Sequence, residues 1–281
     1  MPKGTLFETE ELRKCLGDND LYIIDTRNEI AYNRGHIPGA VNINEIFTYL
    51  CLSENGGYEA MVRFFEKKFS EKGLKRSDRV VIYEDALDNG YGQSCRGWFL
   101  LSLLGHKQVY VLHGGYRAWK SKDLPLIAET VGKEPSQYKG QPDWNLALST
   151  AEMLQAIDKP EIHIVDVRDY AEWNGANSSP YGYDYCPRMG HIPNARWLEW
   201  YRLMVHRKDI PFFKNPRGIL QIGESIGIDP DSEVYLYCFK GARTSNTMMA
   251  LNNAGFTKVR NYFMSWNEWS RNPELPIVEG F

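Results

Sequence analysis

Residues 234–246 read VYLYCFKGARTSN and decide the fold that we expect for the whole chain. The apolar run at 234–237 is typical of a short buried strand, and the residues after Arg243 are typical of the start of a helix. Cys238 lies in the loop between them. A loop in this position directs its backbone N–H groups into one concavity that favours negative charge. We therefore predict that Cys238 has a lowered thiol pKa and reacts as a thiolate.

The sequence that follows Cys238 is rich in positive charge. Residues 239–267 contain no Asp or Glu, but they include Lys240, Arg243, Lys258 and Arg260. The chain as a whole is slightly acidic, with 33 Lys and Arg against 36 Asp and Glu. A positive segment within an acidic chain predicts a site for an anionic substrate beside Cys238.

The motifs of the chain occur twice. The Asp-x-Arg sequence at Asp25 recurs at Asp166, and the Gly-His-Ile-Pro turn at 35–38 recurs at 190–193. The two Asp residues are 166 − 25 = 141 positions apart, which is the size of a duplicated domain and not of a solenoid repeat. Strands alternate with helical segments in both copies, and this order predicts a parallel sheet with helices on both faces.

The duplication predicts two tandem α/β domains. We place the first domain at residues 1–124 and the second at 147–281. Residues 125–146 are rich in Pro, Gly, Gln and charge and show no periodicity. We interpret this segment as a linker that crosses a domain surface.

The two copies differ at the position of Cys238. Glu84 is the matching residue of the first copy, and Asp85 and Asp88 follow it. Carboxylates would repel an anion and supply no sulfur nucleophile, so we expect the first domain to be inactive. The second copy also carries a polar insertion at 173–187, and loops of this kind are usually functional or mobile. We expect the insertion to form a wall between the domains.

The composition excludes several classes of protein. A formal net charge of −3 argues against a nucleic-acid partner, and no stretch approaches the ~18 apolar residues of a membrane span. The five cysteines are odd in number and contain no CxxC pair, which favours free thiols in a reducing compartment over disulfides or a zinc site. We expect a cytoplasmic, monomeric protein without a metal or other cofactor.

The motifs resemble those of the tandem-domain sulfurtransferases of the rhodanese type, over nearly the whole chain. The resemblance includes both Asp-x-Arg motifs, both Gly-His-Ile-Pro turns, the segment GGYRAW at 114–119 and the six-residue loop at 238–243. It implies two pseudo-symmetric domains, a catalytic second domain and a site at the cleft between them.

The resemblance also implies a reaction. In this family the cysteine thiolate attacks the outer sulfur of thiosulfate, sulfite leaves, and the cysteine persulfide passes its sulfur to cyanide or to a thiol. Cys238 is then the nucleophile and the persulfide carrier. A dianionic donor needs positive charge and N–H groups around the loop. The residues expected to bind the substrate are Lys240, Arg243, Phe239, Gly241, Ala242, Thr244 and Arg188.

The loop favours thiosulfate as the sulfur donor. Members of the family that prefer 3-mercaptopyruvate carry Gly and Ser where this chain has Phe239 and Lys240, and they hold the carboxylate with two arginines. One of these arginines is matched by Arg188, but the other falls on Glu172. 3-Mercaptopyruvate remains the alternative donor, and the sulfur acceptor stays open.

Several residues have a structural interpretation beside a functional one. We expect Asp25 and Asp166 to pair with the nearby arginines, His36 and His191 to stabilise their turns, and Cys186 to be a free surface thiol. Both interpretations stay open for the remaining members of this group. They are Arg96, Ser245, Trp197 and Trp200.

Two other functions are possible for a protein with these motifs. A cysteine phosphatase needs an arginine six positions after the cysteine, whereas Arg243 follows Cys238 by 243 − 238 = 5 positions. A non-enzymatic sulfur carrier or binding module would not need the cations of the loop. The sequence therefore favours a sulfurtransferase over both.

Overall fold

The N-terminal half of the chain forms a sheet of five parallel strands. The computed structural model describes residues 5–85, 90–130 and 132–279. The strands lie in the order β1-β5-β4-β2-β3. Their bounds are β1 Leu6–Phe7, β2 Leu21–Asp25, β3 Ala40–Asn42, β4 Arg79–Tyr83 and β5 Val109–Leu112. Neighbouring strands are in parallel register throughout, for example Ile23 opposite Ala40 and Val81.

Helices cover both faces of this sheet. Alternate residues of a strand point to opposite faces, and strand β4 shows the consequence. Val80 and Ile82 pack in one apolar core, whereas Val81 and Tyr83 pack in another with Leu12. The helices are α1 Thr9–Cys15, α2 Glu29–Arg34, α3 Glu45–Thr48, α4 Gly57–Glu71, α5 Gly92–Leu103 and α6 Gly115–Lys120, with a 3-10 turn at Ser53–Asn55.

The C-terminal half repeats this architecture with a smaller sheet. Its parallel strands lie in the order β11-β10-β6-β7. Their bounds are β6 Ile162–Asp166, β7 Arg196–Trp197, β10 Glu233–Tyr237 and β11 Val259–Asn261. The helices are α7 Thr150–Ala156, α8 Tyr170–Trp173, α9 Pro216–Ser225, α10 Ala242–Asn253 and α11 Ser265–Trp269, with 3-10 turns at Trp144–Leu146 and Trp200–Leu203. The predicted pair of α/β units with parallel sheets is confirmed.

An antiparallel hairpin interrupts the repeat in the C-terminal unit. Strands β8 (Met204–Arg207) and β9 (Ile210–Phe213) form it, and Lys208 and Asp209 make its tight turn with positive φ. The hairpin reaches the N-terminal unit, where the Tyr91 hydroxyl donates to a β9 carbonyl. The sequence pattern did not predict this hairpin because each strand is too short to show a clear alternation.

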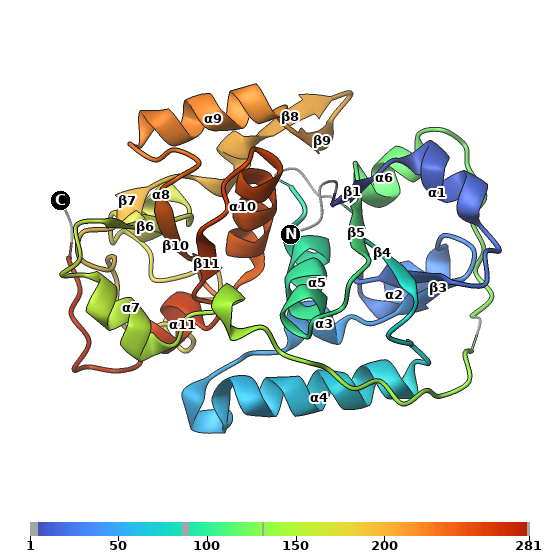
Figure 1. Ribbon diagram of the computed structural model, residues 1–281, viewed down its shortest axis with the longest axis horizontal. Coiled ribbons are helices and arrows are strands. Elements are labelled where there is room, and N and C mark those ends of the chain that lie inside the picture. Colours follow the sequence, from blue (N-terminus) through green and yellow to red (C-terminus); the bar gives the residue numbers. More distant parts are fainter. Residues whose placement is uncertain (1–4, 86–89, 131, 280–281) are drawn as a thin grey trace.

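The segment between the two units packs on the N-terminal unit. It runs along α4 (Figure 1), where Ser136 N donates to Ser70 O at 2.8 Å. Tyr138 is buried and packs edge-on against Phe69. The segment therefore completes the core of the N-terminal unit on this side.

Helices α5 and α10 lie side by side between the two sheets and join the units (Figure 1). Phe99 of α5 stacks on Phe263 with ring centroids 5.1 Å apart. Tyr58 OH donates to Leu148 O at 2.8 Å and accepts from Phe263 N at 3.2 Å. One apolar core continues from the first unit into the second, so the interface resembles a domain interior.

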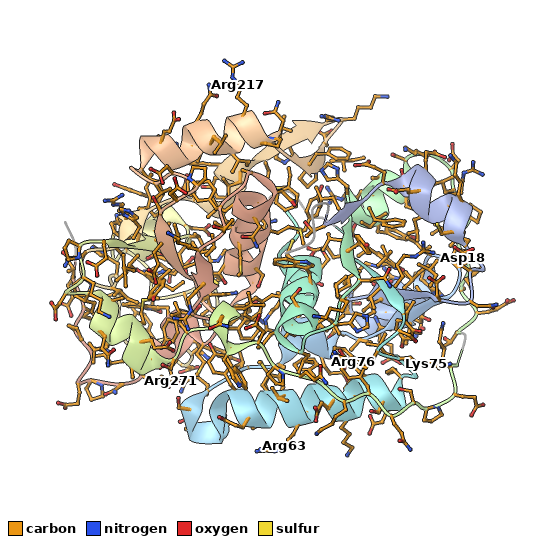
Figure 2. All side chains as sticks on the ribbon, viewed as in Figure 1. Asp18, Arg63, Lys75, Arg76, Arg217 and Arg271 are labelled. Carbon is orange, nitrogen blue, oxygen red and sulfur yellow. The ribbon has the colours of Figure 1, made fainter. Side chains whose placement is uncertain are left out.

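Charged side chains gather at the outside of the molecule. Arg217, Asp18, Arg63 and Arg271 all project from the periphery, while side chains fill the space between sheets and helices (Figure 2). Among the described residues, no helix is both long and apolar enough to cross a membrane.

Candidate active site

Cys238 lies directly after β10, at the start of the loop that leads into α10. Its side chain is 1% exposed. Gly241 is the N-cap of α10 with φ +88, a conformation that glycine adopts at little cost. The turn brings Gly241 N within 3.2 Å of Cys238 Sγ, and Thr244 Oγ1 lies 3.8 Å from the sulfur. The loop therefore surrounds the sulfur with hydrogen-bond donors.

Ser265, the first residue of α11, hydrogen-bonds to Cys238. Its hydroxyl oxygen accepts from Cys238 N at 3.1 Å and lies 3.9 Å from Sγ. Ser265 has φ +59, whereas the first unit has Gly115 in this position with φ +56. A serine in the left-handed region is uncommon and carries strain, which favours a role for its hydroxyl at the site.

The surroundings lower the pKa of the Cys238 thiol. Burial alone would raise this pKa, but the positive charge of Arg243 and the hydrogen bonds from Thr244 and Gly241 outweigh burial. The thiol pKa therefore falls below its ordinary value. The thiolate, and not the thiol, is the nucleophilic form of a cysteine.

Lys240 reaches across to the N-terminal unit. Its Nζ donates to Phe47 O at 2.8 Å and lies over the rings of Phe47 and Tyr181, 4.0 Å and 5.2 Å from their centroids. Burial, followed by repulsion from Arg96, lowers the pKa of Lys240 to about 7, against attraction from the Cys238 thiolate. Lys240 is therefore a cation whose charge varies around neutral pH.

Arg243 is paired with a buried carboxylate. Its guanidinium donates to both oxygens of Glu172, at 2.5 Å and 2.9 Å, and lies 3.5 Å from Asp169. Both acids precede the insertion and are distant from the loop in sequence. They offset the positive charge that the sequence indicated around Cys238. Arg243 still lowers the pKa of Cys238, but it is not an unpaired cation.

A cavity of about 330 Å³ opens beside Cys238, and both units line it. We call it the Cys238 cavity. Its N-terminal wall is formed by Phe47, Glu84, Gly90, Gly92 and Gln93. Its C-terminal wall is formed by Asp169, Pro180, Tyr181, Trp200, Cys238, Phe239, Lys240, Ala242 and Arg243. The insertion contributes Pro180 and Tyr181, so it lies at the contact between the units.

The structure brings most of the predicted site residues together. Phe239, Lys240, Ala242 and Arg243 line the Cys238 cavity. Gly241 and Thr244 lie against the sulfur, as described above.

Arg188, which we also expected to bind the substrate, lies outside this group. Its guanidinium donates to the carbonyls of Ser270, Leu275, Trp269 and Asn272. These bonds tie down the segment that follows α11. Arg188 is adjacent to the Gly-His-Ile-Pro turn in sequence, but it does not line the cavity beside Cys238.

Both Asp-x-Arg motifs are structural, as predicted. Asp25 and Arg27 form a buried pair with Nη2 to Oδ2 at 2.6 Å, and Asp166 and Arg168 repeat it at the same distance. Each arginine also donates to the glycine carbonyl of the following Gly-His-Ile-Pro turn.

The turn histidines are structural as well. Nδ1 of His36 lies 3.0 Å from Tyr32 O, and Nδ1 of His191 lies 3.0 Å from Trp173 O. Each histidine thus bonds the helix that precedes its turn.

Cys186 is not a surface thiol. It is fully buried, and burial raises its pKa to about 11. A thiol with this pKa is a poor redox partner for Cys238. The five cysteines of the chain are all free.

The structure also decides the residues left open. Ser245 donates to Gly241 O at 2.5 Å and so supports the helix start. Trp200 lines the Cys238 cavity, whereas Trp197 donates to Arg168 O at 3.0 Å. Arg96 is fully buried and bonds the carbonyls of both units.

The sequence did not identify several residues of the site. Phe47, Gln93 and Asp169 reach the cavity from elements far from the loop in sequence. Ser265 could have been noticed from the sequence. When the two copies are compared, it stands opposite Gly115, the second glycine of the GGYRAW segment.

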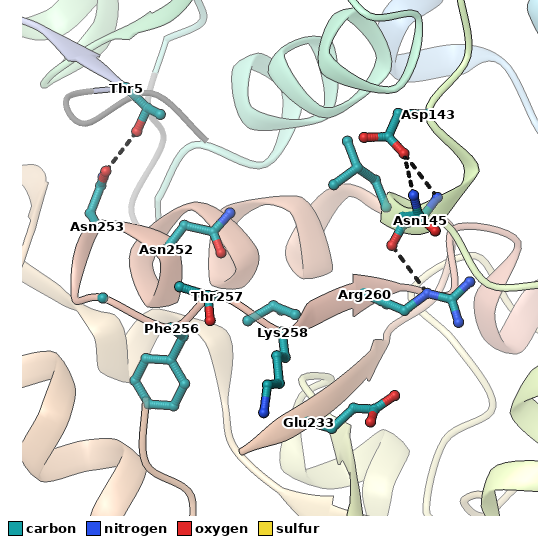
Figure 3. A pocket seen from close by; sticks show the side chains of 13 residues that line it. Thr5, Asp143, Asn145, Glu233, Asn252, Asn253, Phe256, Thr257, Lys258 and Arg260 are labelled. Carbon is teal, nitrogen blue, oxygen red and sulfur yellow. Dashed lines mark hydrogen bonds between the residues drawn. The ribbon is translucent and has the colours of Figure 1, made fainter. Parts of the chain in front are cut away.

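A larger hollow of about 860 Å³ lies away from this site (Figure 3). Glu233, Lys258 and Arg260 project around it, and Arg260 donates to Asn145 O at 3.1 Å. No cysteine is among the described residues that line it. In the described part of the chain, no cluster of His, Cys, Asp and Glu side chains has the arrangement of a metal site.

The fold and the site define a two-unit α/β protein with a buried cysteine of lowered pKa at a cavity between the units. Residues 8–122 and 149–272 each match the rhodanese-like domain. The chain belongs to the rhodanese family, whose members include sulfurtransferase enzymes.

Relatives of known name agree with this assignment. The chain is 27% identical to a thiosulfate sulfurtransferase from Azotobacter vinelandii, covering 97% of this chain and 96% of that protein. It is also 27% identical to a probable 3-mercaptopyruvate sulfurtransferase from Pseudomonas aeruginosa, with full coverage of both. Among solved structures, it resembles the anaerobic ergothioneine biosynthesis enzyme from Chlorobium limicola in complex with its natural substrate trimethyl histidine. The TM-score is 0.85 and the identity 26%, over 99% of this chain and 70% of that one.

Proposed function

We propose that the protein transfers sulfane sulfur from thiosulfate to a thiol or cyanide through a persulfide on Cys238. In the first step the Cys238 thiolate attacks the outer sulfur of thiosulfate, and the S–S bond of thiosulfate breaks to release sulfite. In the second step an acceptor attacks the outer sulfur of the persulfide, and Cys238 leaves as a thiolate. Neither step needs an external oxidant or reductant.

The observation that carries this proposal is the ring of donors around Cys238 Sγ. Gly241 N donates to the sulfur at 3.2 Å, and the hydroxyls of Thr244 and Ser265 lie just below 4 Å. Such donors stabilise an anionic sulfur, whether it is the thiolate or the persulfide. Lys240 at the cavity wall supplies positive charge for the dianionic donor.

The geometry favours thiosulfate over 3-mercaptopyruvate. Arg188 donates its hydrogen bonds to backbone carbonyls, and Glu172 forms an ion pair with Arg243. A keto acid would therefore lack the pair of arginines that holds its carboxylate in other members of the family. Thiosulfate needs only a compact positive region near the sulfur, which Lys240 provides.

The test is formation of the persulfide. Wild-type protein incubated with thiosulfate alone is expected to gain the mass of one sulfur atom, and added cyanide is expected to yield thiocyanate. The matched variants are Cys238→Ser, which loses both, and Cys186→Ser, which keeps both. Wild-type protein that gains no sulfur from thiosulfate, or a Cys238→Ser variant that produces thiocyanate, would contradict the proposal. The same assay with 3-mercaptopyruvate decides between the donors.

A second candidate acceptor is a cationic small molecule such as trimethyl histidine. The observation that favours it is the lining of the Cys238 cavity, where the rings of Trp200, Tyr181 and Phe239 accompany the carboxylates of Glu84 and Asp169. Aromatic faces and carboxylates together bind quaternary ammonium groups. Trimethyl histidine added to the persulfide-loaded protein would gain one sulfur by mass spectrometry. An acceptor that stays unchanged while cyanide is converted removes this candidate.

A further inference from the structure

Glu84 of the first unit and Cys238 of the second line the same cavity. The Glu84 side chain is otherwise buried, at 6% exposure. Glu84 O accepts from Tyr116 N at 2.7 Å, just as Cys238 O accepts from Trp266 N at 3.0 Å. Glu84 therefore occupies the position of the cysteine in its own unit, and both positions open into one cavity.

The carboxylate is held in a fixed position. Ser94 donates to Glu84 Oε2 through its backbone N–H at 2.5 Å and through its hydroxyl at 2.9 Å. Ser94 belongs to the first turn of α5, so the helix start supports the negative charge. A side chain held in this way needs little reorganisation before it acts on a bound molecule.

The buried position of Glu84 brings its pKa close to neutral pH. Burial raises its pKa to about 7, against the hydrogen bonds from Ser94 and Gln93, and Asp85 adds to the increase. Side chains of positive and of negative charge line the same cavity as Glu84. Among the described residues, the titratable and charged groups around it are Asp85, Tyr91, Cys95, Asp169, Cys238, Lys240 and Arg243.

We propose that Glu84 is a catalytic residue that takes the proton of the thiol acceptor. This inference rests on the proposed function, because it concerns the second step of the same reaction. The S–H bond of the acceptor breaks and its proton moves to the Glu84 carboxylate. The acceptor sulfur then bonds to the outer sulfur of the persulfide. The S–S bond to Cys238 breaks with its electron pair on Cys238, and Glu84 later returns the proton to water.

This role explains why a unit without a nucleophile contributes to the cavity. A thiol at neutral pH is mostly protonated and attacks sulfur slowly, whereas its thiolate is the nucleophile. A base with a pKa near the working pH is best matched to remove such a proton. The competing explanation is that Glu84 only caps α5. The two explanations differ in how the rate responds to an acceptor that carries no proton.

The test is a single-turnover transfer from persulfide-loaded protein to two acceptors. Dithiothreitol carries a thiol proton, whereas a neutral phosphine takes the sulfur as a phosphine sulfide and loses no proton. The variant is Glu84→Gln, because its amide oxygen still accepts from Ser94 but cannot take a proton. The control is Asp85→Asn, which removes a neighbouring charge outside the cavity wall. Loss of the extra sulfur mass is followed over time, between about pH 6 and 9.

The expected result is selective loss of transfer to the thiol. Glu84→Gln should slow transfer to dithiothreitol at least ~10-fold near neutral pH and leave the phosphine rate within about twofold. In the wild type the ratio of thiol to phosphine rates should rise through neutral pH. In Glu84→Gln that ratio should follow only the ionisation of dithiothreitol. Asp85→Asn should keep wild-type rates with both acceptors above neutral pH, while the rise of the ratio moves to lower pH because Asp85 no longer raises the pKa of Glu84.

Two results would overturn the inference. Equal slowing with both acceptors would show that Glu84 is a structural cap, and no slowing with either would show that it takes no part. Failure of the proposed function is separate, because the wild type would then gain no sulfur from thiosulfate. In that case inorganic polysulfide installs the persulfide, and the same comparison of acceptors still decides the role of Glu84.

Discussion

At the scale of single residues, the site depends on how each charge is paired. Arg243 shares its charge with Glu172, whereas Lys240 bonds a backbone carbonyl and two aromatic faces. A buried guanidinium paired bidentately stays charged at all working pH values. Burial lowers the pKa of an ammonium that has no carboxylate partner. Lys240 is therefore the residue whose charge can vary.

The first prediction concerns Lys240 and pH. Its lowered pKa of about 7 means that the ammonium is present below that pH and lost above it. Loading by thiosulfate should therefore fall about tenfold per pH unit on the alkaline side, while the acid side follows ionisation of Cys238. Lys240→Arg keeps its charge and should lose the alkaline decline. The measurement is kcat/KM for thiosulfate against pH.

A lysine distant from the site provides the control. Lys258→Arg makes the same substitution beside the larger hollow and should leave the pH profile unchanged. If Lys240→Arg and the wild type decline together at alkaline pH, another group is responsible.

At the scale of elements, the turn from β10 into α10 determines where the sulfur lies. A Cβ on Gly241 would lie 2.3 Å from Cδ2 of Phe263, a side chain that is packed between the units. The positive φ of Gly241 adds strain for any other residue. The close contact and the backbone strain would both occur at Gly241, whose N–H donates to Cys238 Sγ.

The second prediction is that Gly241→Ala damages stability and reactivity together. We expect a loss of about 2 kcal/mol in the free energy of unfolding from backbone strain and overpacking. Alkylation of Cys238 by iodoacetamide should slow about tenfold at neutral pH, because a displaced donor raises the thiol pKa. Denaturant unfolding and alkylation kinetics measure the two effects.

Gly255, just past the other end of α10, is a matched control. Its φ is +101, and a Cβ there would meet nothing within 4 Å. Gly255→Ala should cost about 1 kcal/mol from strain alone and leave alkylation of Cys238 unchanged. Normal alkylation of the Gly241→Ala protein would show that this turn does not set the thiol pKa.

Elements that depend on neighbours in sequence could be predicted, and those that depend on distant contacts could not. The duplication, the parallel sheets and the buried Asp25–Arg27 pair follow from local patterns. The ion pair between Arg243 and Glu172 could not be predicted from the sequence, because the two residues lie 71 positions apart. Arg188 was placed at the substrate from its position beside a motif, yet its orientation is set by the carbonyls after α11.

At the scale of the whole molecule, the two units act on one site. Arg96 of α5 is fully buried and crosses the interface. It donates to Lys240 O at 3.1 Å in the loop after Cys238 and to Tyr49 O at 2.7 Å in the first unit. Burial lowers its pKa to about 10, so it still carries charge at neutral pH. The N-terminal unit thus positions the loop that holds Cys238.

The third prediction is that loss of Arg96 weakens the fold and the chemistry together. Arg96→Ala leaves the buried carbonyls of Lys240, Phe47 and Tyr49 without this donor, and we expect a cost of about 3 kcal/mol in unfolding free energy. Persulfide formation should slow about tenfold, because the loop loses a contact that fixes its geometry. Arg96→Lys keeps the charge and should show a smaller loss of both.

Arg76 separates the effect on the loop from the effect on stability. It also donates to two carbonyls, Leu104 O at 2.7 Å and Gly105 O at 2.9 Å, but both belong to the first unit. Arg76→Ala should therefore lose stability while persulfide formation proceeds at the wild-type rate in the folded protein. If Arg96→Ala also retains the wild-type rate, the N-terminal unit contributes only stability. A selective loss in Arg96→Ala would mean that the first unit, although it has Glu84 at the position of the cysteine, helps to place Cys238 of the second.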